Sequence, residues 1–290
     1  MAKVAHAEAA ALNGLGFPEA LRWRDGALWF SDMFRSRVVS WVPGSPAKTV
    51  LDLAGGGPTM PGGLGWLPDG SLLVVDCIER RVLRVRATSS AVTVHAELAE
   101  FMTHSANDMH VDVDGTSWVG GYGFDPENDV PVPSPLVRVA ADGSASVTAA
   151  TFVFPNGCQR DASDALLVAE TFADRVTSLS HDNEVTQRAV LPSGSGPDGI
   201  SIAPDGTLYV ALAFAGTLVR LAPTKAGADA PAEFVYAPDP IATGPGAGPL
   251  GVYDCAVHPD GTRIAVAIAS ADEALAQRVD TGRIALLELP

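Results

Sequence analysis

The sequence predicts an all-β protein, a six-bladed β-propeller with four antiparallel strands in each blade. Three observations predict this fold. A unit of two alternating apolar runs around a turn Asp recurs along the chain, and its turn positions are Asp25, Asp69, Asp114, Asp164, Asp205 and Asp260. The spacing of roughly 40–50 residues is typical of propeller blades. No long window has helical periodicity, and a closed ring of blades leaves only short, protected strand edges.

The units follow one another along the chain. Their first two strands are expected within residues 17–34, 61–78, 105–124, 154–172, 196–214 and 251–270. The two runs of a unit are joined by the turn Asp, usually followed by Gly, which is the strongest short-range signal for a hairpin. Weaker strands follow each pair, as at residues 37–42 and 48–53 of the first unit. Each unit therefore supplies four strands.

The two ends of the chain are expected to meet in the last blade. Residues 4–11 have no unit of their own, whereas the last unit ends with one clear strand at residues 283–289 (RIALLEL). The N-terminal segment is therefore expected to add the outer strand of the last blade and to close the ring. Because the repeat spans the chain, residues 1–290 are expected to form a single domain.

Composition limits the class of partner. The net charge of −15 and the pI of about 4.6 argue against nucleic acid and anionic membranes. No apolar segment of a signal peptide opens the chain, and the longest apolar run, residues 208–219, is too short to cross a bilayer. Three widely spaced cysteines, Cys77, Cys158 and Cys255, fit reduced thiols. We expect a cytoplasmic monomer or weak homodimer that acts on a small-molecule substrate.

The functional face should be the end where each innermost strand begins. The hairpin turns then lie at the opposite end, and four long connections fall on the functional face, at residues 55–63, 125–135, 241–251 and 271–282. Loops of this length can frame or cover an opening, although they can also be passive surface segments.

Four polar residues occupy equivalent places at the start of the innermost strands. They lie six to eight positions before the turn Asp and are Glu19, Asn107, Asn156 and Asp198, with Gly62 and Tyr253 at the same place in the other two units. Carboxylate and amide oxygens that converge from several strands are the ligands that a hard divalent cation such as Ca²⁺ prefers. The alternative is that these side chains only cap the backbone. No His or Cys occupies these places, which argues against a structural zinc site.

The motifs resemble those of a known family. The segments GFPEALRWRDGALWFSD, SANDMHVD, FPNG and GPDGI, with TGRIALLEL near the C-terminus, resemble the senescence-marker-protein/gluconolactonase/luciferin-regenerating-enzyme family, also called regucalcin-like. The resemblance covers nearly the whole chain. It implies one divalent metal in the channel, Ca²⁺ first, with Zn²⁺, Mn²⁺, Mg²⁺ or Fe²⁺ as alternatives. It implies Glu19, Asn156 and Asp198 as ligands, and Asn107 beside the metal or the substrate.

The family resemblance and the charges together predict a lactone hydrolase. A cation that polarises the lactone carbonyl stabilises the negative charge that develops during attack. Asp198 is expected to take a proton from the attacking water, with Asn107 nearby. His104 is a candidate second acid or base, or a ligand of a substrate oxygen. Strand alternation predicts that Asp108 points away from the channel and is structural, and His110 is expected to be packed.

The predicted mouth of the channel is apolar and aromatic. Its candidate substrate-binding residues are Met33, Phe34, Met60, Tyr122, Phe124, Phe172, Phe214 and Tyr253, with Asp32, Asp76, Glu170 and Thr171 as the polar exceptions. Some of the aromatic residues are alternatively expected to pack between blades. Sugar-acid lactonases of the family carry an Arg just ahead of the Asn-Asp pair, where this chain has Ser105 and Ala106. A lactone, enol-lactone or ester more hydrophobic than gluconolactone is therefore expected.

Three other functions remain open from the sequence. The same metal site could cleave phosphotriesters or support an isomerisation or ring-closing step, and a propeller can also bind a ligand without catalysis. A catalytic cysteine has little support, because no His is placed to pair with Cys158 or Cys255.

Overall fold

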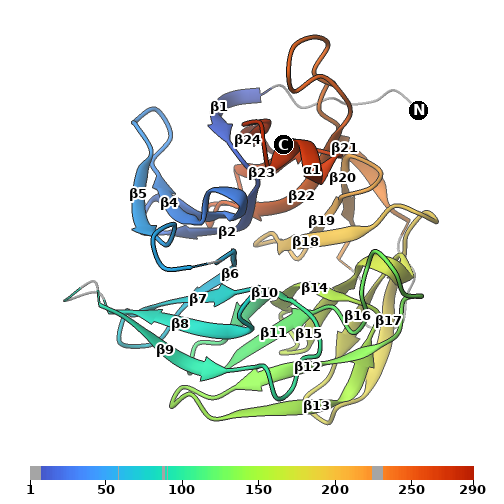
Figure 1. The fold of residues 1–290 in the computed structure, drawn as a ribbon. Helices are drawn as coiled ribbons and strands as arrows, with labels where there is room; N and C mark the ends of the chain where they lie inside the picture. The colour runs from blue at the N-terminus through green and yellow to red at the C-terminus, as the bar shows by residue number, and fades with distance from the viewer. Residues whose placement is uncertain (1–7, 58, 87–88, 90, 224–230) are drawn as a thin grey trace.

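The computed structural model is a ring of six antiparallel four-stranded sheets, and it describes residues 8–57, 59–86, 89, 91–223 and 231–290. The innermost strands β2, β6, β10, β14, β18 and β22 surround a central channel, and later strands of each sheet lie progressively outward (Figure 1). The predicted six-bladed propeller is confirmed. In the part of the chain that the structure describes, no helix is long and apolar enough to cross a membrane.

The strands follow the order expected from the repeat. Blade 1 holds β2 (Pro18–Arg24), β3 (Ala27–Asp32), β4 (Arg37–Trp41) and β5 (Lys48–Asp52). Blade 2 holds β6 (Pro61–Trp66), β7 (Leu72–Asp76), β8 (Arg81–Val85) and β9 (Val92–Glu97). Blade 3 holds β10 (Ala106–Val111), β11 (Ser117–Gly121), β12 (Ser134–Val139) and β13 (Ala145–Phe152). Blade 4 holds β14 (Pro155–Arg160), β15 (Leu166–Glu170), β16 (Arg175–Leu179) and β17 (Val185–Val190).

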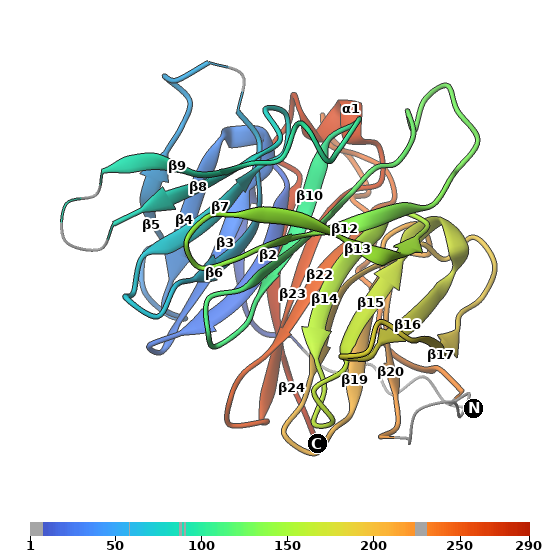
Figure 2. The same ribbon diagram turned by 90° about the horizontal axis from the view of Figure 1, so that it is seen from below.

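Blades 5 and 6 complete the ring. Blade 5 holds β18 (Pro197–Ile202), β19 (Leu208–Leu212), β20 (Thr217–Leu221) and β21 (Glu233–Tyr236). Blade 6 holds β22 (Leu250–Val257), β23 (Arg263–Ser270), β24 (Gly282–Glu288) and β1 (Glu8–Leu15). Three short helices lie between strands: η1 (Met33–Arg35), η2 (Thr171–Ala173) and α1 (Glu273–Ala276). Figure 2 shows α1 at one end of the molecule, together with the connection between β11 and β12, and the C-terminus at the other end.

The N-terminal strand closes the ring as predicted. β1 pairs antiparallel with β24, and the register places Ala11 opposite Ala285 and Leu12 opposite Ile284. Residues 4–7 of the predicted closing segment lie outside the described residues. The last blade is therefore assembled from both ends of the chain.

The turn Asp residues explain why the sequence signal for the hairpins is so regular. Each of several turn carboxylates accepts a hydrogen bond from the backbone N–H two residues later, as from Ser71 to Asp69 and from Thr207 to Asp205, both at 2.9 Å. The Gly between them has a positive φ, +82° at Gly70 and +86° at Gly206, a conformation that costs Gly little. The Asp side chain thus replaces a backbone partner in the turn.

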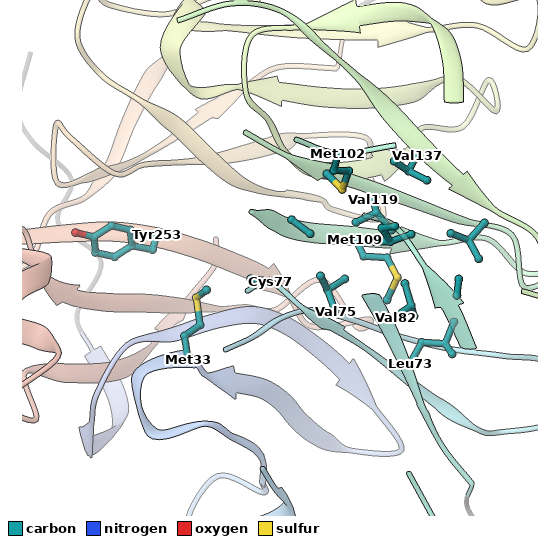
Figure 3. Close-up of a cluster of buried hydrophobic side chains, with 14 of the residues drawn as sticks. Met33, Leu73, Val75, Cys77, Val82, Met102, Met109, Val119, Val137 and Tyr253 are labelled. Atoms are coloured by element: carbon teal, nitrogen blue, oxygen red, sulfur yellow. The ribbon is translucent and has the colours of Figure 1, made fainter. Parts of the chain in front are cut away.

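Apolar side chains fill the space between blades. Figure 3 shows Met33, Cys77 and Tyr253 in one buried cluster that continues through Val75 of blade 2 and Val119 of blade 3. These side chains are almost inaccessible to water, with 6% exposure or less. Packing of this kind contributes roughly 25 cal/mol for each Å² of apolar surface removed from water. The blades are consequently held as fixed walls of the channel.

Candidate active site

A β-bulge near the start of each innermost strand positions the site. The strand registers shift between Glu19 and Arg22, Pro61 and Leu64, Ala106 and Met109, Pro155 and Cys158, Pro197 and Ile200, and Val252 and Asp254. A bulge adds residues to one strand and re-aims their side chains. Because the bulges fall at the same place in all six blades, Glu19, Asn107, Asn156 and Asp198 occupy equivalent positions, as predicted.

A hydrogen bond links two of these four residues. Asn107 Nδ2 donates to Asn156 Oδ1 at 3.0 Å, and Asn156 Nδ2 donates to Thr171 Oγ1 at 3.3 Å. Asp198 is the neighbouring charge that most raises the pKa of Glu19. Asn156 and Asp198 come from neighbouring strands that pack so closely that a Cβ on Gly157 would lie 2.6 Å from the Asp198 carbonyl oxygen.

The two carboxylates are held in surroundings that disfavour their charge. Burial raises the pKa of Glu19 well above its ordinary value, and the charges of Asp198, Asp254 and Asp108 raise it further. Burial likewise raises the pKa of Asp198, with Asp254 and Asp108 as the next causes. Asp198 is 6% exposed, and its buried Oδ1 has no hydrogen-bond partner among the described residues. A buried carboxylate oxygen without a partner is costly unless a cation or a proton compensates it.

This donor set fits a hard divalent cation. Within the described ranges, no three side chains of His, Cys, Asp or Glu gather closely enough to hold a metal by themselves. A cation here would therefore need the amide oxygens of Asn156 or Asn107 beside the carboxylates of Glu19 and Asp198. Oxygen ligands of this mixed type suit Ca²⁺.

An ion-pair cluster, which we call the waist, connects innermost strands across the channel. Arg22 of blade 1 reaches across to blade 3, where its Nη2 donates to Asp108 Oδ1 at 3.1 Å and to the Met109 carbonyl at 2.8 Å. Its Nη1 lies 3.8 Å from Asp254 Oδ2 of blade 6. Asp254 also accepts from the backbone N–H of Leu21 at 2.5 Å. Burial raises the pKa of Asp254 to about 7, although Arg22 acts in the opposite direction.

The expectation that Asp108 points away from the channel is wrong. Its carboxylate pairs with Arg22 from a blade that is not a neighbour, and it acts electrostatically on Glu19 and Asp198. Strict alternation along the strand would have turned it outward, but the bulge between Ala106 and Met109 breaks the alternation. Its expected structural role agrees with the ion pair.

A cavity of about 390 Å³ on the side of the hairpin turns is lined in part by Arg22, Cys158, Ser201 and Cys255. Both thiols face the channel as expected. Burial raises the pKa of Cys158 and of Cys255, so neither thiol ionises readily at neutral pH. This agrees with the expectation that they are not nucleophiles.

The predicted mouth residues divide into two aromatic groups. Tyr122, Phe124, Phe172 and Phe214 form one group with Phe154, whose ring stacks on Tyr122 with 3.7 Å between centroids. Phe34 and Tyr253 form the other with Phe17, at 4.7 and 4.3 Å from it. Met33 is buried, and Met60 packs against the same hydrophobic cluster. Phe214 is the most exposed, at 57%.

Some mouth residues are committed to packing, as the alternative reading of the sequence allowed. Tyr253 is 6% exposed, and its hydroxyl donates to the Ser270 carbonyl at 2.9 Å. Met33 is buried to the same degree. Tyr122, Phe172 and Phe34 are partly buried and keep some exposed surface.

The three acidic residues expected to line the mouth are buried and do not face an opening. Asp32, Asp76 and Glu170 are fully buried, and each pairs with the Arg five residues later: Arg37 at 2.7 Å, Arg81 at 3.0 Å and Arg175 at 2.8 Å. We call these three pairs the clamps. Their carboxylates also accept backbone N–H groups from the segment that leads into the innermost strand, such as Gly16 and Phe17 at Asp32. Of the four polar residues, Thr171 contacts the site, through Asn156.

The two histidines are placed differently. His104 is partly buried in the connection before β10. A role for His104 in catalysis stays a prediction. His110 is partly buried, as expected for a packed residue, and its Nε2 lies 3.1 Å from Asp112 Oδ1.

Comparison with known proteins agrees with the motifs. A sequence profile of the SMP-30/gluconolactonase/LRE-like region matches residues 17–234. The chain belongs to this family. No curated protein matches the chain closely enough in sequence to count as a relative.

Solved structures of proteins named for the SMP-30/gluconolactonase/LRE-like family share the fold. A calcium-binding protein, regucalcin, from Agrobacterium tumefaciens is 16% identical with a TM-score of 0.72, over 99% of this chain and 96% of that chain. A luciferin-regenerating enzyme is 17% identical with a TM-score of 0.75, over 96% and 93%. A gluconolactonase from Xanthomonas campestris is 17% identical with a TM-score of 0.68, over 96% and 89%.

Sequence reasoning missed several residues of this family member's channel. Arg22 lies three positions after Glu19, and Asp254 lies one position after Tyr253. Knowledge of the bulges would have predicted that both side chains point into the channel. Phe154 has a left-handed backbone conformation, with a φ of +53°, and no sequence pattern predicts this conformation. Glu273 of α1 was expected only as part of a long loop, yet it acts electrostatically on Asp198.

Proposed function

We propose that the protein is a divalent-metal-dependent hydrolase of a lactone or related cyclic ester that is more hydrophobic than a sugar lactone. Membership of a family that includes gluconolactonases supports the reaction class. The calcium-binding description of the regucalcin structure supports Ca²⁺ as the first metal to test. The oxygen-rich set of Glu19, Asn107, Asn156 and Asp198 supports a hard cation in general.

One observation carries the proposal: Asp198 Oδ1 is buried without a hydrogen-bond partner among the described residues, and a second, partly buried carboxylate, Glu19, acts on it electrostatically. A propeller that served only as a scaffold would gain stability from apolar or fully paired residues here. The unpaired oxygen is therefore better explained by a role toward a bound group.

The residues present have separable tasks in hydrolysis. Glu19, Asn156 and Asp198 would hold the cation, with Asn107 beside it. When bound, a divalent cation supplies stabilisation of the negative charge that develops on an oxygen during attack on a carbonyl. The hydrogen bonds from Asn107 to Asn156 and from Asn156 to Thr171 fix the orientation of both amides.

Asp198 is the proposed general base. It would accept the proton of the attacking water at Oδ1 and later return it to the alkoxide of the opened ring. Burial and the neighbouring charges of Asp254 and Asp108 raise the pKa of Asp198, which strengthens it as a proton acceptor, whereas a bound cation would act in the opposite direction. The aromatic walls around Tyr122, Phe154 and Phe172 would exclude water from the substrate's apolar part and favour a hydrophobic lactone over a sugar lactone.

The test is a substrate panel assayed with the Asp198→Asn variant. With Ca²⁺ supplied, aromatic and alkyl lactones should be opened with a higher kcat/KM than gluconolactone. Asp198→Asn should lower kcat/KM by about 100-fold or more, since general-base catalysis typically contributes at least that factor. Asp182→Asn, in an exposed loop between β16 and β17, should behave like the wild type.

Circular dichroism of Asp198→Asn should confirm that the variant is folded. Full hydrolytic activity in Asp198→Asn would remove the proposed base. A clear preference for gluconolactone would contradict the substrate class, and phosphotriester cleavage without lactone opening would contradict the reaction.

A further inference from the structure

A separate cavity, of about 850 Å³, lies between blades 3 and 4, which are neighbours in the ring (Figure 1). It is lined by the end of β10 and the hairpin turn that follows, from His110 to Asp114, whereas Asn107 of the candidate active site lies near the start of β10. Its volume is within the range of small-molecule sites. None of its lining residues has a task in the proposed hydrolysis.

One wall of this cavity is a row of side chains across blade 3. The register places Trp118 of β11 opposite His110 of β10 and opposite Arg138 of β12. Residues opposite each other on antiparallel strands share a face of the sheet, and all three line the cavity. Blade 4 contributes Leu166 and Leu179, both buried and opposite each other in the register of β15 and β16. The cavity therefore combines an aromatic and cationic wall with an apolar one.

Two of the charged side chains in this cavity neutralise each other. Asp112 accepts from Arg160 Nε at 2.7 Å and from Arg160 Nη2 at 2.9 Å. It also accepts from Trp118 Nε1 at 2.7 Å, and His110 Nε2 lies 3.1 Å from its Oδ1. The indole is thus fixed by its N–H edge. Because Asp112 and Arg160 are bound to each other, neither is left to pair with a charged ligand.

Arg138 is the exception among these charges. It is exposed, and within the described residues its side chain has no ion-pair or hydrogen-bond partner. Its Cζ lies 6.0 Å from the centroid of the Trp118 ring, at the outer limit of a cation–π contact. The other two carboxylates of the lining, Asp114 and Asp164, lie at exposed turns, where solvent and salt screen their charge. Arg138 thus remains available to a ligand.

An unpaired guanidinium beside aromatic and apolar walls is complementary to one chemistry of ligand. A carboxylate can accept two parallel N–H groups of an Arg, and an aromatic body gains from packing on an indole. We propose that this cavity binds an organic acid, with its carboxylate on Arg138 and its apolar or aromatic body between Trp118 and Leu179. The proposed site uses no residue of the channel and is independent of the proposed hydrolase function.

The experiment is calorimetric titration of the Ca²⁺-loaded protein with naphthoate, with naphthamide as its neutral isostere, and with acetate as a carboxylate that has no apolar body. Naphthoate should bind about tenfold or more tightly than naphthamide, and acetate should give no measurable binding. In Arg138→Gln the affinity for naphthoate should fall by about tenfold, and that for naphthamide should stay within about twofold. Arg86→Gln removes the same charge from an exposed position in blade 2 and should bind all three probes like the wild type.

Val147→Asp provides a second variant. Val147 lines the cavity from β13 and is 48% exposed, so the fold should tolerate the substitution, as circular dichroism can verify. The added carboxylate should weaken naphthoate binding and leave naphthamide binding within about twofold of the wild type.

Three results would overturn the proposed site. They are no saturable binding of naphthoate, equal affinities of the wild type for naphthoate and naphthamide, and naphthoate affinity that is unchanged in both Arg138→Gln and Val147→Asp. Lactone turnover is measured separately and should be the same in Arg138→Gln as in the wild type. Failure of the organic-acid site and failure of the hydrolase proposal are therefore distinguishable.

Discussion

Arg22 introduces one permanent positive charge among the buried carboxylates of the channel. Its guanidinium contacts blade 3 through Asp108 and approaches blade 6 through Asp254, and so it couples three innermost strands. A guanidinium with several rigid donors suits this task better than a lysine ammonium. Loss of one partner from a buried pair leaves the other charges uncompensated, which costs more than the pair itself contributes.

Replacing Arg22 with Met should therefore lower the free energy of unfolding by about 3 kcal/mol, whereas Arg22→Lys should lose less. Urea denaturation of the Ca²⁺-loaded protein measures both changes. Arg278→Met, at an exposed position, is the control and should stay within about 0.5 kcal/mol of the wild type. An Arg22→Met variant as stable as the control would show that the waist contributes little.

At the scale of single residues, the sequence predicted the positions that lie at a fixed distance from the turn Asp. It missed the side-chain orientations that the bulges change. Glu19, Asn107, Asn156 and Asp198 lie at a nearly constant distance from the turn Asp, so alignment of the repeats was sufficient. Asp108 lies inside the bulge, where alternation no longer says which way a side chain points. Bulges have no composition signal of their own, which is why the waist could not be predicted.

The clamps set the position of whole strands. In blade 1, Asp32 Oδ1 accepts from the backbone N–H groups of Gly16 at 2.9 Å and Phe17 at 3.0 Å, and Oδ2 accepts from Arg37. The segment fixed in this way leads directly into Glu19. A side chain at the end of β3 thus helps to determine where Glu19 stands on β2 of the same blade.

Asp32→Ala should consequently affect both stability and metal binding. We expect a loss of about 3 kcal/mol in the free energy of unfolding, because buried N–H groups and Arg37 lose their acceptor. We also expect Ca²⁺ affinity to fall by about tenfold or more, as supporting residues of metal sites typically show. Calorimetric titration and urea denaturation measure the two effects. Asp52→Ala, exposed at the end of β5, should change neither, and unchanged Ca²⁺ affinity in Asp32→Ala would separate the clamp from the site.

Elements were predictable where the signal was local. The Asp-Gly turns announced the hairpins, because the Asp carboxylate and the Gly backbone build the turn themselves. The four residues of α1 are too few to show periodicity, so no sequence pattern distinguishes them from a loop. The clamps were mistaken for mouth residues, although the spacing of Asp or Glu and an Arg five positions later was visible in three units.

At the scale of the whole molecule, the channel concentrates negative charge that a cation can neutralise. Burial and mutual repulsion raise the pKa of Glu19, Asp198 and Asp254, in the last case to about 7. An acid whose pKa is raised by folding keeps its proton in the native state at a pH where the unfolded chain has lost it. The metal-free protein therefore loses stability as the pH rises from the ordinary carboxylate range toward 7.

A bound divalent cation should reverse this loss, because it binds the ionised carboxylates of the native state. The gain in Tm from Ca²⁺ over chelator should grow by about 3 °C or more between about pH 5 and pH 7. Differential scanning calorimetry at matched ionic strength measures the gain, and Asp198→Asn should reduce it. A gain that does not change with pH would separate cation binding from these carboxylates.

The architecture of the ring was the most predictable property, since each of the six copies of the unit predicts the same four-stranded blade. Closure by β1 followed from counting strands, because the last unit was one strand short. The precise contents of the channel were less predictable. They depend on which side chains from distant units contact one another. Each contact depends on backbone irregularities such as the bulges, which the sequence repeat does not encode.

The pairing of β1 with β24 also determines when the ring of blades can close during synthesis. β1 is synthesised before its partner strand β24, from which blades 1 to 5 separate it, so β1 cannot dock until residues 282–288 have been made. Blades 1 to 5 draw their strands from continuous segments and can form in sequence, whereas blade 6 completes last. Until then, the unpaired edge of β24 is a surface to which a second chain can add its own β1, and high concentrations of nascent chains should favour exchanged dimers.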